Sequence, residues 1–120
     1  MPIANCIISL DQSKQLDISD EIIELWGKHS GKDTSEMTVM ISHSDEQLGK
    51  AYSAICCLYL PNIWSRESVS ALQVGLANAL ADCLAVELSD IMVMTSLIES
   101  GFVVEKGREV KWVEKQNNNA

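Results

Sequence analysis

A proline stands in the second position of the chain, directly after Met1. If Met1 is removed, which is expected because the second residue is small, Pro2 carries a free secondary amine. Burial in an apolar pocket lowers the pKa of such an amine, because desolvation disfavours the charged form. An amine of this kind can act as a general base near neutral pH. The alternative is structural, since a proline lacks an N–H and suits the first residue of a strand.

The remaining side chains with reactive chemistry predict neither a metal site nor a cofactor site. None of the four cysteines belongs to a C-x-x-C pair, and all lie in apolar stretches, which favours buried, reduced thiols. The two histidines are far apart and have no partners at the spacing of metal ligands. The residues in question are Cys6, Cys56, Cys57, Cys83, His29 and His43.

Length and charge restrict the class of protein. A chain of 120 residues with 47% hydrophobic residues is expected to form one domain with a full core. A net charge of −8 argues against nucleic acid and anionic membrane surfaces as partners, because both require a basic face. No apolar run has the length of a membrane span, and the first residues do not resemble a secretion signal. We therefore expect a cytoplasmic protein.

Hydrophobic patterning predicts alternating strands and helices. Strands are expected at residues 2–10, 37–42, 54–60 and 91–95, and helices at residues 18–30 and 65–85. Within the first helix, His29 is predicted to share the buried face with Ile22 and Trp26. Lys106-Gly107 is a two-residue hairpin signal between two short strands. The domain is expected to span residues 1–113, and residues 114–120 to form a disordered tail.

The chain also repeats itself. Residues 35–42 align with residues 89–96 at four identical positions and one acidic pair, and residues 4–10 resemble residues 54–60. Each half is therefore a β-α-β unit. Right-handed crossovers put both helices on one face of a four-stranded mixed sheet. The predicted fold class is α+β, with two tandem β-α-β units and a short C-terminal hairpin. Because the strands are apolar on both faces, the uncovered face is expected to meet other subunits.

These features resemble the tautomerase superfamily, which includes 4-oxalocrotonate tautomerase and macrophage migration inhibitory factor. The resemblance rests on Met1-Pro2-Ile3-Ala4, the doubled β-α-β unit, and Ser30-Gly31-Lys32 after the first helix. It implies a homotrimer with active sites at subunit boundaries and Pro2 as the base. It also implies that Lys32 pairs with a substrate carboxylate. The alternative for Lys32 is a solvated cation favoured by the helix dipole.

The resemblance also points to positions where the chain departs from the family. Pro61 stands where the family uses a backbone amide to bind substrate, and Asn62 is the alternative donor because Pro61 has no N–H. Thr95 is implied as a substrate-binding residue where the cytokine branch has an asparagine. Thr38 stands where 4-oxalocrotonate tautomerase has a catalytic arginine. These departures affect which substrate the site would bind and leave the predicted base, Pro2, unchanged.

The predicted function is a cofactor-independent isomerase that moves a proton α to the carbonyl of a small 2-oxo acid. Pro2 would take the proton, and Lys32 would hold the carboxylate and stabilise the developing enolate. Hydration or decarboxylation with the same base remains open. The alternative from a different class is a catalytically silent trimer that binds a protein or a small acid. Retention of Met1 would favour that alternative, because the Pro2 nitrogen would then be an amide without basicity.

Overall fold

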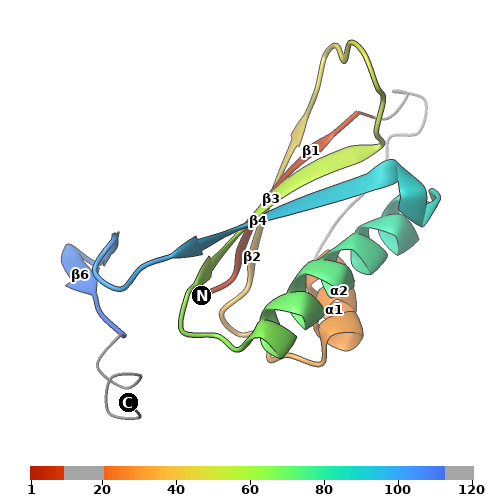
Figure 1. The fold of residues 1–120 in the computed structure, drawn as a ribbon. Helices are drawn as coiled ribbons and strands as arrows, with labels where there is room; N and C mark the ends of the chain where they lie inside the picture. Colours follow the sequence, from red (N-terminus) through yellow and green to blue (C-terminus); the bar gives the residue numbers. More distant parts are fainter. Residues whose placement is uncertain (10–20, 113–120) are drawn as a thin grey trace.

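The structure is a computed structural model that describes residues 1–9 and 21–112. The predicted start of the first helix at Ile18 and the predicted tail at residues 114–120 lie outside the described residues. Within the described part, the order of elements is the one that the doubled β-α-β pattern predicts (Figure 1).

Four strands form one mixed sheet in the order β2-β1-β3-β4. The pairs β1–β2 and β3–β4 are parallel, and β1 and β3 pair antiparallel at the centre of the sheet. Two β-α-β units therefore meet along their first strands, which confirms the predicted fold class. The strands are β1 (Ile3–Ile8), β2 (Thr38–His43), β3 (Ala54–Pro61) and β4 (Ile91–Ile98).

β4 extends beyond its predicted end at Thr95. Thr95 interrupts the apolar run from which the strand was predicted. The strand nevertheless continues to Ile98, because β3 offers paired residues as far as Pro61. The backbone N–H of Asn62 then donates to the carbonyl of Ile98 at 2.9 Å and closes the ladder. Strand pairing, rather than local sequence, sets this boundary.

Both helices, α1 (Glu21–Ser30) and α2 (Arg66–Leu84), cover the same face of the sheet (Figure 1). Trp26 of α1 is completely buried, and its indole N–H donates to the carbonyl of Leu72 in α2 at 2.9 Å. The prediction that His29 lies on the buried face is wrong: His29 is exposed and contacts Asp82 of α2. A polar ring that reaches a carboxylate on the neighbouring helix has a better partner than the apolar core offers.

The opposite face of the sheet has no helix over it among the described residues (Figure 1). Ile7, Met40 and Met94 lie on this face and are 42%, 50% and 49% exposed. We call this surface, made by the outward side chains of the four strands, the open face. Its apolar character agrees with the expectation that this face meets other subunits.

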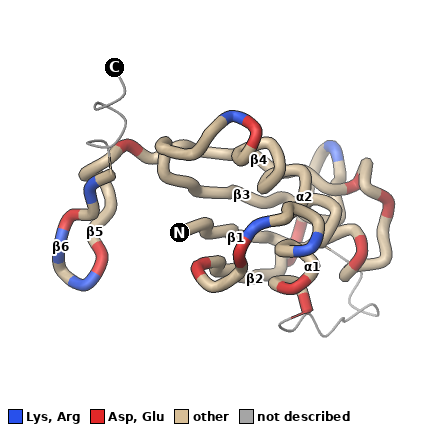
Figure 2. The backbone as a smooth tube through the Cα atoms, turned by 90° about the horizontal axis from the view of Figure 1, so that it is seen from below, with Lys and Arg blue, Asp and Glu red and all other residues tan. Residues whose placement is uncertain are grey.

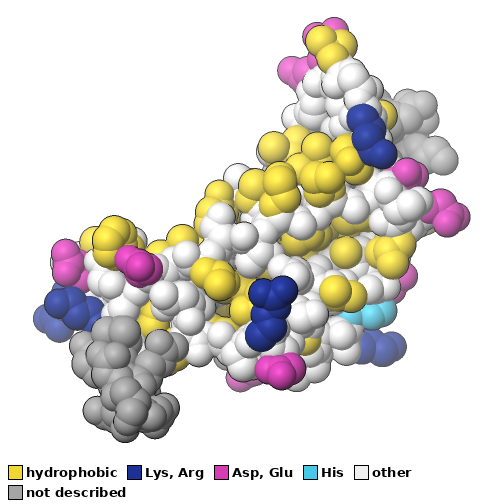
Figure 3. All heavy atoms as spheres, in the orientation of Figure 1, with side chains coloured by type: hydrophobic (Ala, Val, Ile, Leu, Met, Phe, Trp, Pro, Cys, Tyr) yellow, Lys and Arg dark blue, Asp and Glu magenta, His cyan; other side chains and the backbone are white. Residues whose placement is uncertain are grey.

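The predicted hairpin is present and projects from the body of the domain (Figure 1). It pairs β5 (Val103–Glu105) with β6 (Arg108–Val110). Lys106 and Gly107 join them with positive φ angles of 57° and 76°, as a tight two-residue hairpin turn requires. Figure 3 shows hydrophobic side chains along β4 and on the hairpin. Neither helix of the described residues is long and apolar enough to cross a membrane.

The four cysteines are free thiols; Cys6 and Cys56 are buried as predicted, whereas Cys57 and Cys83 are only half-buried. Cys6 and Cys56 face each other across β1 and β3 and are completely buried. A side-chain hydrogen bond with Cys6 and burial both raise the pKa of Cys56 above its ordinary value. Cys57 points the other way, is half-buried, and pairs with Asn5 and Met94 in the register of the sheet.

We expect all four thiols to alkylate slowly in the native protein. The raised pKa of Cys56 leaves little thiolate, and burial blocks access to it. Cys57 on the open face should be protected only by a neighbouring subunit. Alkylation with iodoacetamide, followed by peptide mass spectrometry, measures both rates. Fast native labelling of Cys56 would contradict its place in the core, and fast labelling of Cys57 alone would indicate a free open face.

Candidate active site at the N-terminus

Pro2 lies at the start of β1, and its side chain is fully buried. Its carbonyl accepts a hydrogen bond from the N–H of Thr38 at 3.0 Å, which ties the N-terminus to the beginning of β2. The pairing of Ile3 with Tyr59 places Pro2 beside the last residues of β3. The predicted base therefore has a fixed and largely dry position. Its place as the residue before the first strand is equally consistent with the structural interpretation of the proline.

A cavity of about 280 Å³ lies at the N-terminus, and neither Pro2 nor Lys32 is among the residues that line it. Met1 and Ile3, residues 35–38 and residues 103–105 of the hairpin line this cavity. Burial lowers the pKa of the Met1 amine below its usual value, while the carboxylates of Glu36 and Glu105 oppose the shift. Figure 2 shows acidic positions both in the hairpin and near the start of β2, with the N-terminus between them.

Lys32 lies where the chain leaves α1. Gly31 turns the backbone with a φ of 72°, and the Lys32 ammonium then donates to the hydroxyl of Ser68 at 2.8 Å. The ammonium also lies 5.8 Å from the centre of the Trp64 ring. Ser68 is in the first turn of α2, where its N–H donates to the capping hydroxyl of Ser65.

The positive end of a helix dipole disfavours a cation and favours an anion. The Lys32 ammonium lies beside the first turn of α2. Its full positive charge therefore adds to the partial positive charge of that helix end. The two positive groups together make this corner of the domain favourable for a carboxylate. The structure thus gives Lys32 a more specific setting than the solvated helix end that forms the alternative interpretation.

Pro61, the last residue of β3, is buried and offers no N–H. The neighbouring donor, Asn62, already gives its backbone N–H to Ile98 at 2.9 Å. Its side-chain oxygen accepts from the indole N–H of Trp112 at 2.8 Å. Binding of a substrate through the Asn62 amide would therefore require the end of the β3–β4 ladder to open. Roles for Pro61 and Asn62 remain predictions.

Thr95 does not reach Pro2 within one chain. Its hydroxyl donates to the side-chain oxygen of Gln73 at 2.5 Å, between β4 and α2. The strand order places β3 between β1 and β4, so Thr95 and Pro2 belong to strands that do not touch. A site that contained both residues would have to draw Thr95 from another subunit. Thr38, in contrast, lines the cavity at the N-terminus.

Four residues around these groups were not predicted from the sequence. Ser68 and Trp64 hold the Lys32 ammonium, and Glu36 and Glu105 line the cavity at the amine. Ser68 could have been suspected from its place in the first turn of a predicted helix. Glu105 could not, because only the folded hairpin brings it near the N-terminus.

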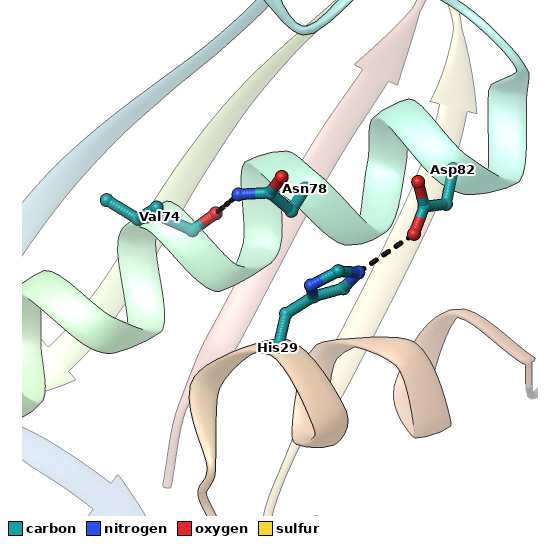
Figure 4. Close-up of polar contacts among 4 residues, drawn as sticks. All are labelled: His29, Val74, Asn78 and Asp82. Atoms are coloured by element: carbon teal, nitrogen blue, oxygen red, sulfur yellow. Dashed lines mark hydrogen bonds and ion pairs between the residues drawn. The ribbon is translucent and has the colours of Figure 1, made fainter.

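A second cavity, of about 320 Å³, lies between α2 and the start of β4, lined by Val74, Asn78 and Ile91 among others. On the same side of the helix layer, the ring of His29 lies 2.8 Å from the Asp82 carboxylate (Figure 4). Asn78 donates to the carbonyl of Val74 at 3.0 Å, a bond within one turn of α2 (Figure 4). The residues that the structure describes contain no cluster of His, Cys, Asp or Glu able to hold a metal ion.

A scan of the sequence against protein-family models gives no match, and a search of curated proteins gives none. The fold, however, is similar to several solved structures. A native fused 4-OT superposes with a TM-score of 0.71 at 14% identity, covering 89% of this chain and 94% of that one. The chain has the tautomerase fold.

Two further neighbours extend the similarity across the superfamily. The macrophage migration inhibitory factor of Oncomelania hupensis gives a TM-score of 0.71 at 11% identity, covering 99% of this chain and 88% of that one. N1, a member of the cis-3-chloroacrylic acid dehalogenase family, gives 0.66 at 12% identity, with 95% and 88% covered. The tautomerase fold inferred from the N-terminal proline and the doubled β-α-β unit is therefore confirmed.

Proposed function

We propose that this protein is a cofactor-independent isomerase that moves a proton α to the carbonyl of a small 2-oxo acid. Pro2, freed by removal of Met1, is the general base. The observation that carries the proposal is that Pro2 is fully buried next to β1, while the residues on either side of it, Met1 and Ile3, line a cavity. The structural neighbours, 4-OT and the dehalogenase relative N1, support the choice of an enzyme with this fold.

The chemistry needs one base and one cation. The neutral Pro2 nitrogen takes a proton from the enol or from the carbon next to the carbonyl, and the resulting ammonium returns it at another carbon. Negative charge develops on the substrate oxygen between the two transfers, and a fixed cation stabilises it. Lys32, with the positive end of α2 beside it, supplies that cation and binds the carboxylate.

The choice of a 2-oxo acid has support from a structural neighbour. Pt0534, which superposes with a TM-score of 0.68 at 11% identity, was solved after inactivation by 2-oxo-3-pentynoate. That compound is itself a 2-oxo acid. A carboxylate next to a carbonyl also matches the positive corner formed by Lys32 and the first turn of α2.

We further propose a homotrimer that works in the cytoplasm. The open face is apolar and no helix of the described residues covers it, and two neighbours of this fold are a symmetric and an asymmetric fused 4-OT trimer. A trimer would also allow Thr95 of one subunit to approach Pro2 of the next. The free thiols agree with a reducing compartment.

Proton exchange tests the proposal directly. The purified chain, shown by intact mass to lack Met1, is incubated in D₂O with a panel of 2-oxo acids, and loss of the proton signals at the carbon next to the carbonyl is followed by NMR. We expect catalysed exchange or ketonisation for at least one monocarboxylic member. A chain with a free Pro2 amine that exchanges no member of the panel would overturn the proposal.

Replacing Lys32 by alanine should weaken substrate binding and move the pH profile. Removal of the cation leaves the substrate carboxylate without its partner in a dry site, so KM should rise by about tenfold or more. The proposed site requires the Lys32 ammonium to lie near the Pro2 amine, so its removal should also raise the pKa of that amine and move the acid limb of the kcat/KM profile to higher pH.

Lys28→Ala is the matched control, because Lys28 lies in the last turn of the same helix but is exposed. It should change neither KM nor the acid limb. A Lys32→Ala enzyme that behaves like Lys28→Ala would show that Lys32 is only a helix-end charge.

The second candidate is a binding module without chemistry. It requires that Met1 stays on the chain, because the Pro2 nitrogen is then an amide without basicity. The intact mass of the protein isolated from its native cells decides between the two. Retained Met1 would favour the binding module, and its removal would favour the enzyme.

A further inference from the structure

Ser68 lies toward the same edge of the sheet as Pro2. Residues 31–37 run from the end of α1 to the start of β2, where the backbone bonds to Pro2. Residues 62–65 run from the end of β3, beside the N-terminus, to the first turn of α2. Figure 1 shows the N-terminus and the start of α2 at the same end of the domain. The contact between Lys32 and Ser68 therefore belongs to the end of the molecule that holds the proposed base.

The hydroxyl of Ser68 has a donor that the described protein does not use. A serine hydroxyl can accept two hydrogen bonds and donate one. Ser68 Oγ accepts from the Lys32 ammonium at 2.8 Å, and no acceptor within residues 1–9 and 21–112 takes up its own O–H. The side chain is half-buried, so a ligand at the surface can reach it. The hydroxyl hydrogen is therefore available to a ligand.

The Lys32 ammonium also has donors to spare. An ammonium carries three N–H donors, and Ser68 takes one of them. The Trp64 ring, 5.8 Å from Nζ, is a weak partner for the charge, and no carboxylate of the described residues forms an ion pair with it. The backbone N–H of Lys32 donates to Ser30 Oγ at 3.2 Å. The lysine is thus held at its backbone and at its tip, and its charge lacks a counter-ion there.

We propose that Ser68 is a second ligand of the substrate carboxylate. One carboxylate oxygen receives a hydrogen bond from the Lys32 ammonium, and the other receives one from the Ser68 hydroxyl. The two donor atoms are 2.8 Å apart, so one planar carboxylate can reach both. This inference deepens the proposed function and rests on it, because it takes Lys32 to bind the carboxylate.

The first test measures binding without turnover. 2-Oxobutanoate is titrated into ¹⁵N-labelled protein, and the indole N–H signal of Trp64 reports binding because the ring lies beside the ammonium. The indole N–H of the buried Trp26 is the internal reference. Ser68→Ala should raise the Kd by about fivefold to thirtyfold, as expected for a lost hydrogen bond to a charged group at a half-buried position. Ser68→Thr keeps the hydroxyl and should stay within about threefold of the wild type.

Ser70→Ala is the matched control, because Ser70 lies in the same helix two residues further on and is exposed. It should leave the Kd unchanged. A Ser68→Ala protein that binds 2-oxobutanoate like Ser70→Ala would overturn the inference. A wild-type Trp64 signal that does not respond to 2-oxobutanoate would overturn it as well.

A double-mutant cycle with Lys32→Ala separates a direct bond from an effect through the lysine. If Ser68 donates to the carboxylate, Ser68→Ala should still raise the Kd about threefold or more in the Lys32→Ala protein. If Ser68 only holds the ammonium in place, its replacement should have no effect once the lysine is gone. The second result would overturn the direct bond.

Proton exchange by the same variants distinguishes a failure of this inference from a failure of the proposed function. Catalysed exchange by Ser68→Ala with an unchanged KM would overturn the role of Ser68 and leave the isomerase intact. Binding of 2-oxobutanoate that depends on Ser68, without exchange of any 2-oxo acid, would overturn the isomerase and leave the carboxylate site intact.

Discussion

Replacing Pro2 by glycine should lower kcat/KM for proton exchange by about 10²–10⁴-fold, the range that a positioned general base contributes. Glycine still allows removal of Met1 and leaves a free amine. That amine is primary, and it has lost the ring that is buried at the start of β1. The base would therefore be neither held in place nor desolvated to the same degree. Steady-state kinetics on the best 2-oxo acid of the panel measures the loss.

A neighbouring substitution controls for changes in the strand itself. Ile3→Val keeps a β-branched residue in β1 and should retain activity within a few-fold. Circular dichroism of Pro2→Gly should match the wild type, since the hydrogen bond to Thr38 uses the backbone carbonyl. Wild-type activity in a folded Pro2→Gly protein would exclude Pro2 as the base.

Replacing Met94 by lysine should convert the proposed trimer to monomers at micromolar concentration. Met94 lies on the open face and is 49% exposed in a single chain. A lysine buried there without a partner would cost about 3–5 kcal/mol at each interface. Activity should fall along with the trimer if the site lies at a subunit boundary. Sedimentation velocity and kinetics on the same sample measure both effects.

Leu48→Lys is the control for this substitution, because Leu48 is 83% exposed in the loop between β2 and β3. It should leave the mass of the assembly unchanged. A monomeric wild type, or a Met94→Lys protein that stays trimeric, would show that the open face is not the interface. Faster alkylation of Cys57 in the Met94→Lys protein would independently report exposure of the open face.

The fold could be predicted because its strongest signals are local. The apolar run at residues 54–60 predicts a strand, and the cap at Ser65 predicts the start of a helix. The repeat of residues 35–42 at residues 89–96 then indicates that the chain consists of two successive β-α-β units. The wrong predictions concern features that depend on tertiary contacts. β4 continues to Ile98 because β3 pairs with it, and His29 turns to Asp82 on a helix that is distant in sequence.

The site could be predicted only in part. Pro2 and Lys32 stand out because an N-terminal proline and a lysine after a helix-ending glycine are visible in one line of sequence. Their surroundings are not visible there. Ser68 lies 2.8 Å from the Lys32 ammonium only because α1 and α2 pack side by side, and Glu105 reaches the cavity only through the hairpin.

The most direct test of the central claim is titration of the Pro2 nitrogen by ¹⁵N NMR, alongside the pH dependence of kcat/KM. We predict an amine whose pKa lies below that of an exposed N-terminal proline, because it is buried. The same pKa should appear as the acid limb of the kinetic profile, since only the neutral amine can accept the proton. An amide signal at Pro2, or an amine pKa that differs from the acid limb, would contradict the account.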